Sequence, residues 1–253
     1  MKQVEIALSV VSHGQISMID ALLQDIARNC QQTSLEVILT LNVPEDLPAS
    51  LEQLPFSLLV LHNESPLGFG ENHNRAFQHA RAPYFCVINP DIRVASDIFP
   101  VLMDTLKDPS CGVTAPMIVN GEDLIEDSAR KFPTPLKILC KAFGGCRRQD
   151  YQMGSGLLEP DWVGGMFMVF RRNTYALFGG FDQKFFLYYE DVDLCARIRL
   201  QGLRVVMIPS VRATHLARRS SHSSAVYSFM HIHSMIRFFA SLVFVKVMWR
   251  RGR

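Results

Sequence analysis

The sequence has little net charge and no closely spaced cysteines. A formal charge of +2 over 253 residues is too small to imply nucleic-acid binding by itself. The six cysteines form no C-x-x-C pair and mostly lie in apolar or helical surroundings. This pattern predicts buried, reduced thiols and a cytosolic protein.

Long hydrophobic runs are also missing. A helix that crosses a bilayer needs roughly 18 to 20 apolar residues, and the longest candidate, Phe238–Val245, is far shorter. The N-terminus enters a predicted strand at once and lacks the apolar region and cleavage site of a signal peptide. No internal repeat or low-complexity segment is visible. We therefore expect a chain that folds without a membrane span.

With 48% hydrophobic residues, the chain can bury a sizeable core. We interpret it as one large domain over residues 1–220 and an appended segment over residues 221–253. Lys and Arg are unevenly placed, which suggests an anionic surface or an anionic substrate met locally. They gather in Arg130–Arg148, Arg212–Arg219 and Trp249–Arg253.

Short apolar segments alternate with amphipathic ones, which predicts an α/β fold with a mainly parallel sheet. The predicted strands are Val4–Val11, Leu35–Leu41, Ser57–Leu61, Tyr84–Ile88, Gly112–Met117, Met166–Phe170 and Arg204–Ile208. In open parallel sheets, ligands bind beyond the carboxyl ends of the strands. Polar side chains follow each of the first three predicted strands, at Ser12-His13, Asn42 and His62-Asn63 respectively. Each of them taken alone is also ordinary loop sequence.

Two further segments have the form of ligand-binding loops. Gly68–Ala76 is a glycine-punctuated entry to a helix, whose first amides can hold an anion, although the GK[ST] ending of a Walker loop is absent. The strand Tyr84–Ile88 runs directly into Asn89-Pro90-Asp91, where a carboxylate at the strand tip is well placed for a divalent cation. The same tripeptide is also excellent turn sequence.

The stretch Phe181–Ile198 delivers three carboxylates, Glu190, Asp191 and Asp193, to the start of a predicted helix. Acids in a first turn also cap free amides and complement the helix dipole. The approach is rich in aromatic residues, however, and a carboxylate that acts as a base benefits from a shaped, partly dry pocket. This context favours a catalytic interpretation.

Two features lie downstream of these acids. His215 follows a strand, where a lone histidine is usually structural but is also within plausible reach of a metal shared with the acids. Tyr227–Arg251 is predicted to form a helix or a helix pair that ends in basic residues. Such a segment either lies on a membrane surface or packs against the domain, and the sequence favours neither.

Four features taken together resemble the pattern of one enzyme family. They are the strand-end pocket, the glycine-rich helix entry, the Asn-Pro-Asp strand end and the segment GGFDQKFFLYYEDVDLCARIR. They are similar to the inverting family 2 glycosyltransferases, most closely the bacterial rhamnosyltransferases that build O-antigen and related surface glycans. The resemblance covers roughly residues 4–220 and is most specific over 162–199. It implies the GT-A fold, a Rossmann-like, mainly parallel sheet flanked by helices, here followed by a C-terminal amphipathic helical segment.

The resemblance assigns roles residue by residue. Asp191 resembles the catalytic base and Glu190 its supporting neighbour. Asp91 resembles the metal-binding acid of the family's Asp-x-Asp element, with Asn89 where the first acid usually stands. His215 resembles the histidine that some relatives use as a further ligand of the divalent cation, Mg²⁺ or Mn²⁺.

The remaining positions concern substrates. Residues that match donor nucleotide-binding positions are Ser12, His13, Asn42, Gly68, Asn74 and Asn89. Positions assigned to the acceptor side are Trp162, Gly164, Gly165 and Tyr189. Because many relatives have an aspartate where Asn42 stands, the nucleobase cannot be inferred from this position.

The resemblance implies transfer of a sugar, L-rhamnose from dTDP-rhamnose in the first place, to a polyprenyl-diphosphate-linked GlcNAc with inversion. A lipid-linked acceptor implies an enzyme that is cytoplasmic and peripheral on the inner face of the bacterial cytoplasmic membrane. UDP-galactofuranose and UDP-glucose are alternative donors that share every feature above. A non-catalytic nucleotide-sugar-binding protein and a metal-dependent hydrolase using Asp91, Asp191 and His215 are alternatives from other classes.

Overall fold

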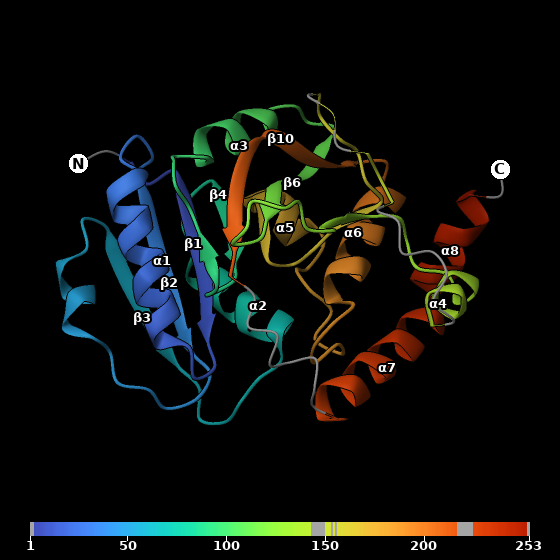
Figure 1. Ribbon diagram of the computed structural model, residues 1–253, viewed down its shortest axis with the longest axis horizontal. Helices are drawn as coiled ribbons and strands as arrows, with labels where there is room; N and C mark the ends of the chain where they lie inside the picture. The colour runs from blue at the N-terminus through green and yellow to red at the C-terminus, as the bar shows by residue number, and fades with distance from the viewer. Residues whose placement is uncertain (1–2, 143–149, 153, 155, 217–224, 252–253) are drawn as a thin grey trace.

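A single eight-stranded sheet forms the centre of the computed structural model, which describes residues 3–142, 150–152, 154, 156–216 and 225–251 (Figure 1). The strand order is β3-β2-β1-β4-β9-β6-β10-β5. The strands are β1 (Ile6–Ser12), β2 (Leu35–Leu41), β3 (Ser57–His62), β4 (Tyr84–Ile88), β5 (Ile92–Arg93), β6 (Cys111–Val119), β9 (Phe167–Arg171) and β10 (Arg204–His215). β7 (Ala129–Arg130) and β8 (Trp162–Val163) pair separately.

The directions of the strands bring the predicted ligand-binding loops to one edge. β1 pairs in parallel with β2 and β4, β2 with β3, and β6 with β10, whereas β9 is antiparallel to both β4 and β6. β1, β2, β3, β4, β6 and β10 therefore all end at the same edge of the sheet. This arrangement confirms the predicted α/β fold with a mainly parallel sheet.

Helices cover both faces of the sheet. They are α1 (Ile16–Asn29), α2 (Phe69–His79), α3 (Phe99–Thr105), α4 (Pro135–Ala142), α5 (Arg172–Leu177), α6 (Glu190–Leu200), α7 (Ala225–Phe239), α8 (Leu242–Arg251) and the 3-10 helix η1 (Ala49–Gln53). Residues of α1 and α3 pack in one hydrophobic cluster, and residues of α2, α5 and α6 pack in a second. In Figure 1, α1 lies in front of β1–β3.

β10 is longer than the sequence predicts. The expected strand ended at Ile208 because Pro209 follows it, but β10 continues to His215. Its register against β6 shifts between Ile208 and Arg212, and this irregularity accommodates the proline, which cannot donate a ladder hydrogen bond. The continuation pairs His215 with Ile92 of β5, so the histidine lies beside the Asn-Pro-Asp segment.

The C-terminal segment forms a helix pair that packs on the domain. α7 and α8 meet at a bend of 62°. Phe238 and Val247 are buried in a third cluster that includes Phe185, Tyr189 and Val192. Of the helices described, none is long and apolar enough alone to cross a membrane, while α7 and α8 taken together, bent, reach the required length and composition.

Four of the cysteines, Cys30, Cys86, Cys111 and Cys195, are buried thiols, in agreement with the sequence analysis. Several expectations fall outside the described residues. These are the basic residues Arg147, Arg148, Arg218 and Arg219 and the boundary between residues 220 and 221. The two-part division of the chain stays a prediction.

Candidate active site at the carboxyl edge of the sheet

The first three strand ends are joined by a network of side-chain amides. Asn42 Nδ2 lies 3.1 Å from His13 Nδ1, and Asn42 Oδ1 accepts hydrogen bonds from Asn63 Nδ2 and from the Leu67 backbone, both at 2.8 Å. The Asn42 backbone donates to the carbonyl of Ser12 at 2.8 Å. The structure thus brings Ser12, His13 and Asn42 together at one edge of the sheet, as the sequence predicts. This edge presents several hydrogen-bond donors and acceptors.

Two residues of this network were not among the predicted site residues. Asn72 Oδ1 accepts a hydrogen bond from Asn63 Nδ2 at 2.6 Å, and Arg75 donates to Asn63 Oδ1. Asn72 is 1% exposed, which marks it as a structural organiser of the loop that follows β3. Both residues lie on α2, and the glycine-punctuated start of this helix was the only sequence signal that pointed to them.

The start of α2 is packed against residues 181–189, which we call the aromatic segment. The Phe69 amide donates to the Phe186 carbonyl at 2.8 Å. A Cβ atom at Gly68 would lie 2.7 Å from the same oxygen, so this position requires a glycine for the close approach. The Phe69 amide is therefore not available to an anion, whereas Gly68 does place α2 against the segment that carries the acids.

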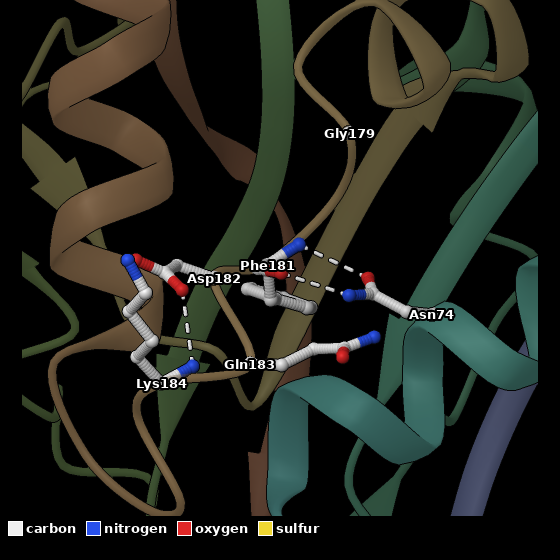
Figure 2. Close-up of a pocket in the computed structure, with 6 residues that line it drawn as sticks. All are labelled: Asn74, Gly179, Phe181, Asp182, Gln183 and Lys184. Carbon is white, nitrogen blue, oxygen red and sulfur yellow. Dashed lines mark hydrogen bonds between the residues drawn. The ribbon is translucent and has the colours of Figure 1, made fainter.

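Asn74 belongs to a different network. Its Oδ1 accepts from Tyr175 Oη at 2.7 Å and from the Phe181 amide at 3.0 Å, and its Nδ2 donates to the Phe181 carbonyl at 2.8 Å. Figure 2 shows this side chain turned toward the Phe181 backbone, at the wall of a cavity of about 500 Å³. None of the other predicted site residues lines this cavity. In this structure Asn74 fastens the aromatic segment to α2.

Asp91 and His215 meet although they are far apart in the sequence. His215 Nε2 lies 3.2 Å from Asp91 Oδ2, and His215 Nδ1 lies 2.8 Å from Glu126 Oε2. Asp91 Oδ1 is buried and has no hydrogen-bond partner among the described residues. Asn89 lies just before them and donates its amide to the Met166 carbonyl at 2.9 Å. Glu126 was not predicted, because it follows β6 in a polar loop with no periodic or motif signal.

The charges around His215 determine its protonation. Burial alone would lower the pKa of His215, but its hydrogen bonds and its attraction to Asp91 and Glu126 outweigh burial and raise the pKa to about 9. In the metal-free protein at neutral pH, the imidazolium is therefore held between two carboxylates. This single positive charge offsets part of the negative charge of the two carboxylates.

We expect the metal-free protein to lose stability as pH rises from 6.5 to 9. The folded-state pKa of His215 is raised from its ordinary value of 6.5 to about 9, so its contribution to stability is complete below pH 6.5 and is lost as pH passes through 9. After solvent screening is allowed for, the loss is on the order of 1–2 kcal/mol. Thermal melts in chelator across this range measure it, and His215→Asn is expected to flatten the profile. An equally steep profile in that variant would assign the loss to other groups.

Asp191 is aimed by two backbone amides. Its Oδ2 accepts from the Gly165 amide at 2.9 Å, and its Oδ1 accepts from the Val192 amide at 2.8 Å. Burial raises the pKa of Asp191, although these amides counteract part of the effect. A carboxylate whose proton affinity is raised and whose direction is fixed has the two properties that a general base requires.

The neighbouring acids have different environments. Glu190 is 5% exposed, and its Oε2 has no hydrogen-bond partner among the described residues. Burial, followed by repulsion from Asp191, raises the pKa of Glu190 well above its ordinary value, which favours the neutral form of this side chain. Asp193 instead forms an ion pair with Arg197 at 2.7 Å. Asp191 is therefore the acid of this turn that is best suited to accept a proton.

Comparison with known proteins identifies the family. The family model described as "Glycosyltransferase like family 2" matches residues 4–229. The chain belongs to this glycosyltransferase family. Rhamnosyltransferase WbbL of Escherichia coli (strain K12) is 27% identical over 243 residues, which cover 91% of this chain and 91% of that protein. The resemblance predicted from the sequence is confirmed.

More distant relatives of this glycosyltransferase agree. The N-acetylglucosaminyl-diphospho-decaprenol L-rhamnosyltransferase of Mycobacterium tuberculosis (strain ATCC 25618 / H37Rv) is 27% identical over 194 residues, which span 66% of this chain and 61% of that protein. The fold of this chain is similar to that of GalNAc-T7 with UDP, GalNAc and Mn²⁺, with a TM-score of 0.67 and 16% identity. The match covers 85% of this chain and 44% of that one. The mannosyltransferase PcManGT from Pyrobaculum calidifontis in complex with GDP-Man and Mn²⁺ gives a TM-score of 0.62 at 16% identity, over 90% of this chain and 61% of that one. These structures show that the fold is GT-A.

The positions predicted for the acceptor side of the glycosyltransferase have different surroundings, and Tyr189 differs from the other three. Gly165 contacts Asp191 directly, and the Gly164 amide donates to the Ser128 carbonyl at 2.9 Å. Trp162 lies in β8 and its Nε1 donates to the Lys131 carbonyl at 3.1 Å. Tyr189, by contrast, is 7% exposed because its ring packs under Phe238 of α7. Gly165 is the member of the set that borders Asp191.

The turn before Glu190 is strained. Tyr188 and Tyr189 both have positive φ angles, 69° and 68°, a backbone conformation that costs about 1–3 kcal/mol for each non-glycine residue. No sequence pattern indicates it, because bulky aromatic residues normally avoid this region. This turn leads directly into α6, whose Asp191 contacts the Gly165 amide just before β9.

Proposed function

We propose that this glycosyltransferase transfers L-rhamnose from dTDP-rhamnose to a hydroxyl of a polyprenyl-diphosphate-linked GlcNAc in bacterial surface polysaccharide synthesis. The observation that carries the reaction type is the partly buried Asp191 held by the Gly165 and Val192 amides at 2.9 and 2.8 Å. The sugar and the acceptor are supported by the names of the E. coli and mycobacterial relatives.

The mechanism uses Asp191 as a base. It accepts the proton of the acceptor hydroxyl while the hydroxyl oxygen attacks the anomeric carbon from the face opposite the diphosphate, so the configuration inverts. The raised pKa of Glu190 beside it favours a neutral side chain there, which limits the negative charge of the turn. Asp91 and His215 would face the departing diphosphate.

We infer that a divalent cation, Mg²⁺ or Mn²⁺, binds at Asp91 and His215. The 3.2 Å separation of Asp91 Oδ2 and His215 Nε2 is close to the spacing of about 3 Å between neighbouring ligands in an octahedral site. The unpaired Asp91 Oδ1 offers a further ligand atom. A bound cation would neutralise the charge that develops on the departing diphosphate. Within the described part of the chain no cluster of three or more His, Cys, Asp or Glu residues forms a metal site. Asp91 and His215 would hold the cation together with oxygens of the donor diphosphate.

Glu126→Gln should weaken Mn²⁺ binding by about tenfold or more, because a carboxylate on the far ring nitrogen of a histidine ligand orients the ring and raises its basicity. Isothermal titration of Mn²⁺ in the presence of dTDP measures this, with thermal melting to confirm folding. Glu122→Gln, an exposed acid of the same loop, is the matched control. Unchanged Mn²⁺ affinity in Glu126→Gln would remove Glu126 from the site.

The experiment that tests the proposed function is nucleotide release across a panel of donors with Mg²⁺ or Mn²⁺, with and without a polyprenyl-diphosphate-GlcNAc acceptor. We expect release from dTDP-rhamnose only when the acceptor is present. Release from UDP-galactofuranose or UDP-glucose would keep the mechanism and change the donor. Release without acceptor would identify a hydrolase, and donor binding without turnover would identify a binding protein.

We also propose that the enzyme works in the cytoplasm, peripherally on the inner face of the bacterial membrane, where a polyprenyl-linked acceptor would be found. The predicted basic residues Arg130 and Lys131 are in the described part of the chain, and the Arg130 guanidinium lies 5.4 Å from the Trp162 ring centre. Cell fractionation tests this location. Recovery only in the soluble fraction of a low-salt lysate would contradict it.

A further inference from the structure

Helix α7 has two faces of opposite character. Its inner face holds Ser234 and Phe238, which are 2% and 0% exposed, and Ser234 Oγ donates to the Leu187 carbonyl at 2.8 Å. On the opposite side, Phe229, Ile232 and Ile236 are 70%, 51% and 59% exposed. These three recur at intervals of three and four residues, so they form one apolar stripe along the helix.

Helix α8 repeats the arrangement. Val247 is 5% exposed and faces the domain, whereas Leu242, Val245 and Trp249 are 76%, 56% and 62% exposed. Together the outward residues form what we call the outer apolar face: Phe229, Ile232, Ile236, Leu242, Val245 and Trp249. In Figure 1 both helices lie at the end of the molecule away from β1–β3. So many large exposed apolar side chains on two successive helices indicate a surface that is covered in use.

The charges indicate what covers it. The sequence contains no Asp or Glu after Asp193, while α7 and α8 carry Arg237, Lys246, Arg250 and Arg251. Lys246 and Arg250 are exposed, whereas Arg251 forms an ion pair with Asp161. Apolar side chains beside exposed cations match a partner with an apolar interior and an anionic surface, which is the chemistry of an anionic lipid bilayer.

We propose that the outer apolar face docks on the surface of an anionic bilayer, with α7 and α8 lying in the interface. The inner residues Phe238 and Val247 stay packed on the catalytic domain, so the helices connect the domain to the lipid. This resolves the two alternatives left by the sequence, since one face of each helix packs and the other docks. The docking goes beyond the proposed chemistry, and only its use in reaching a lipid-linked acceptor rests on the proposed function.

The inner face of α7 touches the strained turn of the active site. The His231 ring centre lies 5.2 Å from that of Tyr188 and 5.4 Å from that of Tyr189, and the Phe238 ring is 5.7 Å from Tyr189. These two tyrosines have positive φ and lead directly into Glu190. A bilayer that holds α7 in place therefore also holds the turn that positions the catalytic acids.

The test uses the full chain and co-sedimentation with vesicles of phosphatidylglycerol and phosphatidylethanolamine. Deleting the helices would uncover Tyr189 and Phe185, so point substitutions are preferable. We expect the wild type to bind and Phe229→Ser/Ile232→Ser/Ile236→Ser to lose at least tenfold in vesicle affinity, a loss of about 1.4 kcal/mol. Leu59→Ser/Val101→Ser, which changes residues 42% and 41% exposed in β3 and α3, is the matched control. If the triple variant melts early, Leu242→Ser/Trp249→Ser on α8 replaces it.

The outcomes separate the proposal from its rivals. Wild-type protein that stays in the supernatant, or a triple variant that binds as the wild type does, would overturn the docking. A dimer in sedimentation velocity that the triple variant abolishes, without vesicle binding, would assign the face to a second copy of the chain. Slower amide exchange over residues 187–191 on vesicle binding supports the connection to the turn, and unchanged exchange refutes it. None of these measurements depends on sugar transfer. A failure of the proposed function can therefore be distinguished from a failure of the docking proposal.

Discussion

Asp191→Asn is expected to reduce the rate of sugar transfer by at least about a hundredfold while donor binding is retained, because general-base help typically contributes 10²–10⁴-fold. The asparagine amide cannot accept the proton of the acceptor hydroxyl. It also offers one acceptor oxygen where two backbone amides, of Gly165 and Val192, now donate. Single-turnover kinetics with dTDP-rhamnose, combined with a donor titration, separate the two effects.

The matched control is Asp182→Asn, a partly exposed acid of the same segment that caps the Lys184 amide at the wall of the cavity in Figure 2. Its rate should be unchanged. In the wild type, raised pKa values predict an acid limb of the rate profile above the ordinary range of aspartate, because Asp191 must be ionised to act. Unchanged turnover in Asp191→Asn would remove Asp191 from the mechanism.

Asp91→Ala should lower Mn²⁺-dependent dTDP binding by at least about tenfold, since even outer residues of metal sites contribute that much. The substitution removes both Asp91 oxygens, one facing His215 at 3.2 Å and one without a partner. Isothermal titration of dTDP with Mn²⁺ and with chelator measures the metal-dependent part. Binding in chelator is expected to stay the same.

Asp104→Ala is the control for this second prediction, because Asp104 is an exposed acid that pairs with Lys107 on the surface. Full metal-dependent binding in Asp91→Ala would contradict the assignment of Asp91. Loss of binding in chelator as well would instead indicate a disturbed nucleotide pocket. The rhamnosyl transfer proposal survives either result, since its donor panel is measured on the wild type.

Local patterns predicted the parallel strands well, because buried apolar segments such as Leu35–Leu41 and Tyr84–Ile88 are bounded by turn residues and match β2 and β4 to the residue. They failed at Pro209, where pairing with β6 on both sides overrides the local signal to stop. The strand-end rule also located Asn42 and Asp91. Where the local signal is weak, tertiary interactions such as the pairing of β10 with β6 determine the secondary structure.

The partners of the site residues were beyond reach of the sequence. Glu126 contacts His215, which lies 89 residues away, and Asn72 contacts Asn63, which lies nine residues away; neither residue lies in a pattern that marks function. The positive φ angles of Tyr188 and Tyr189 contradict the preference of those residue types, and α7 packs against both rings. Residue type therefore indicated candidate site residues, whereas the side chains that hold them in place depend on tertiary contacts.

The pairing of Asp91 with His215 has a consequence for the newborn chain. The two residues are joined by the antiparallel contact of β5 with β10, and β9 must be inserted between β4 and β6 before the sheet is continuous. During synthesis the first four strands emerge long before these late strands do. A ribosome-bound fragment that has folded its amino-terminal half therefore lacks His215, the partner of Asp91, and all of α6, which carries Glu190 and Asp191. The paired Asp91 and His215 can form only after His215 has left the exit tunnel.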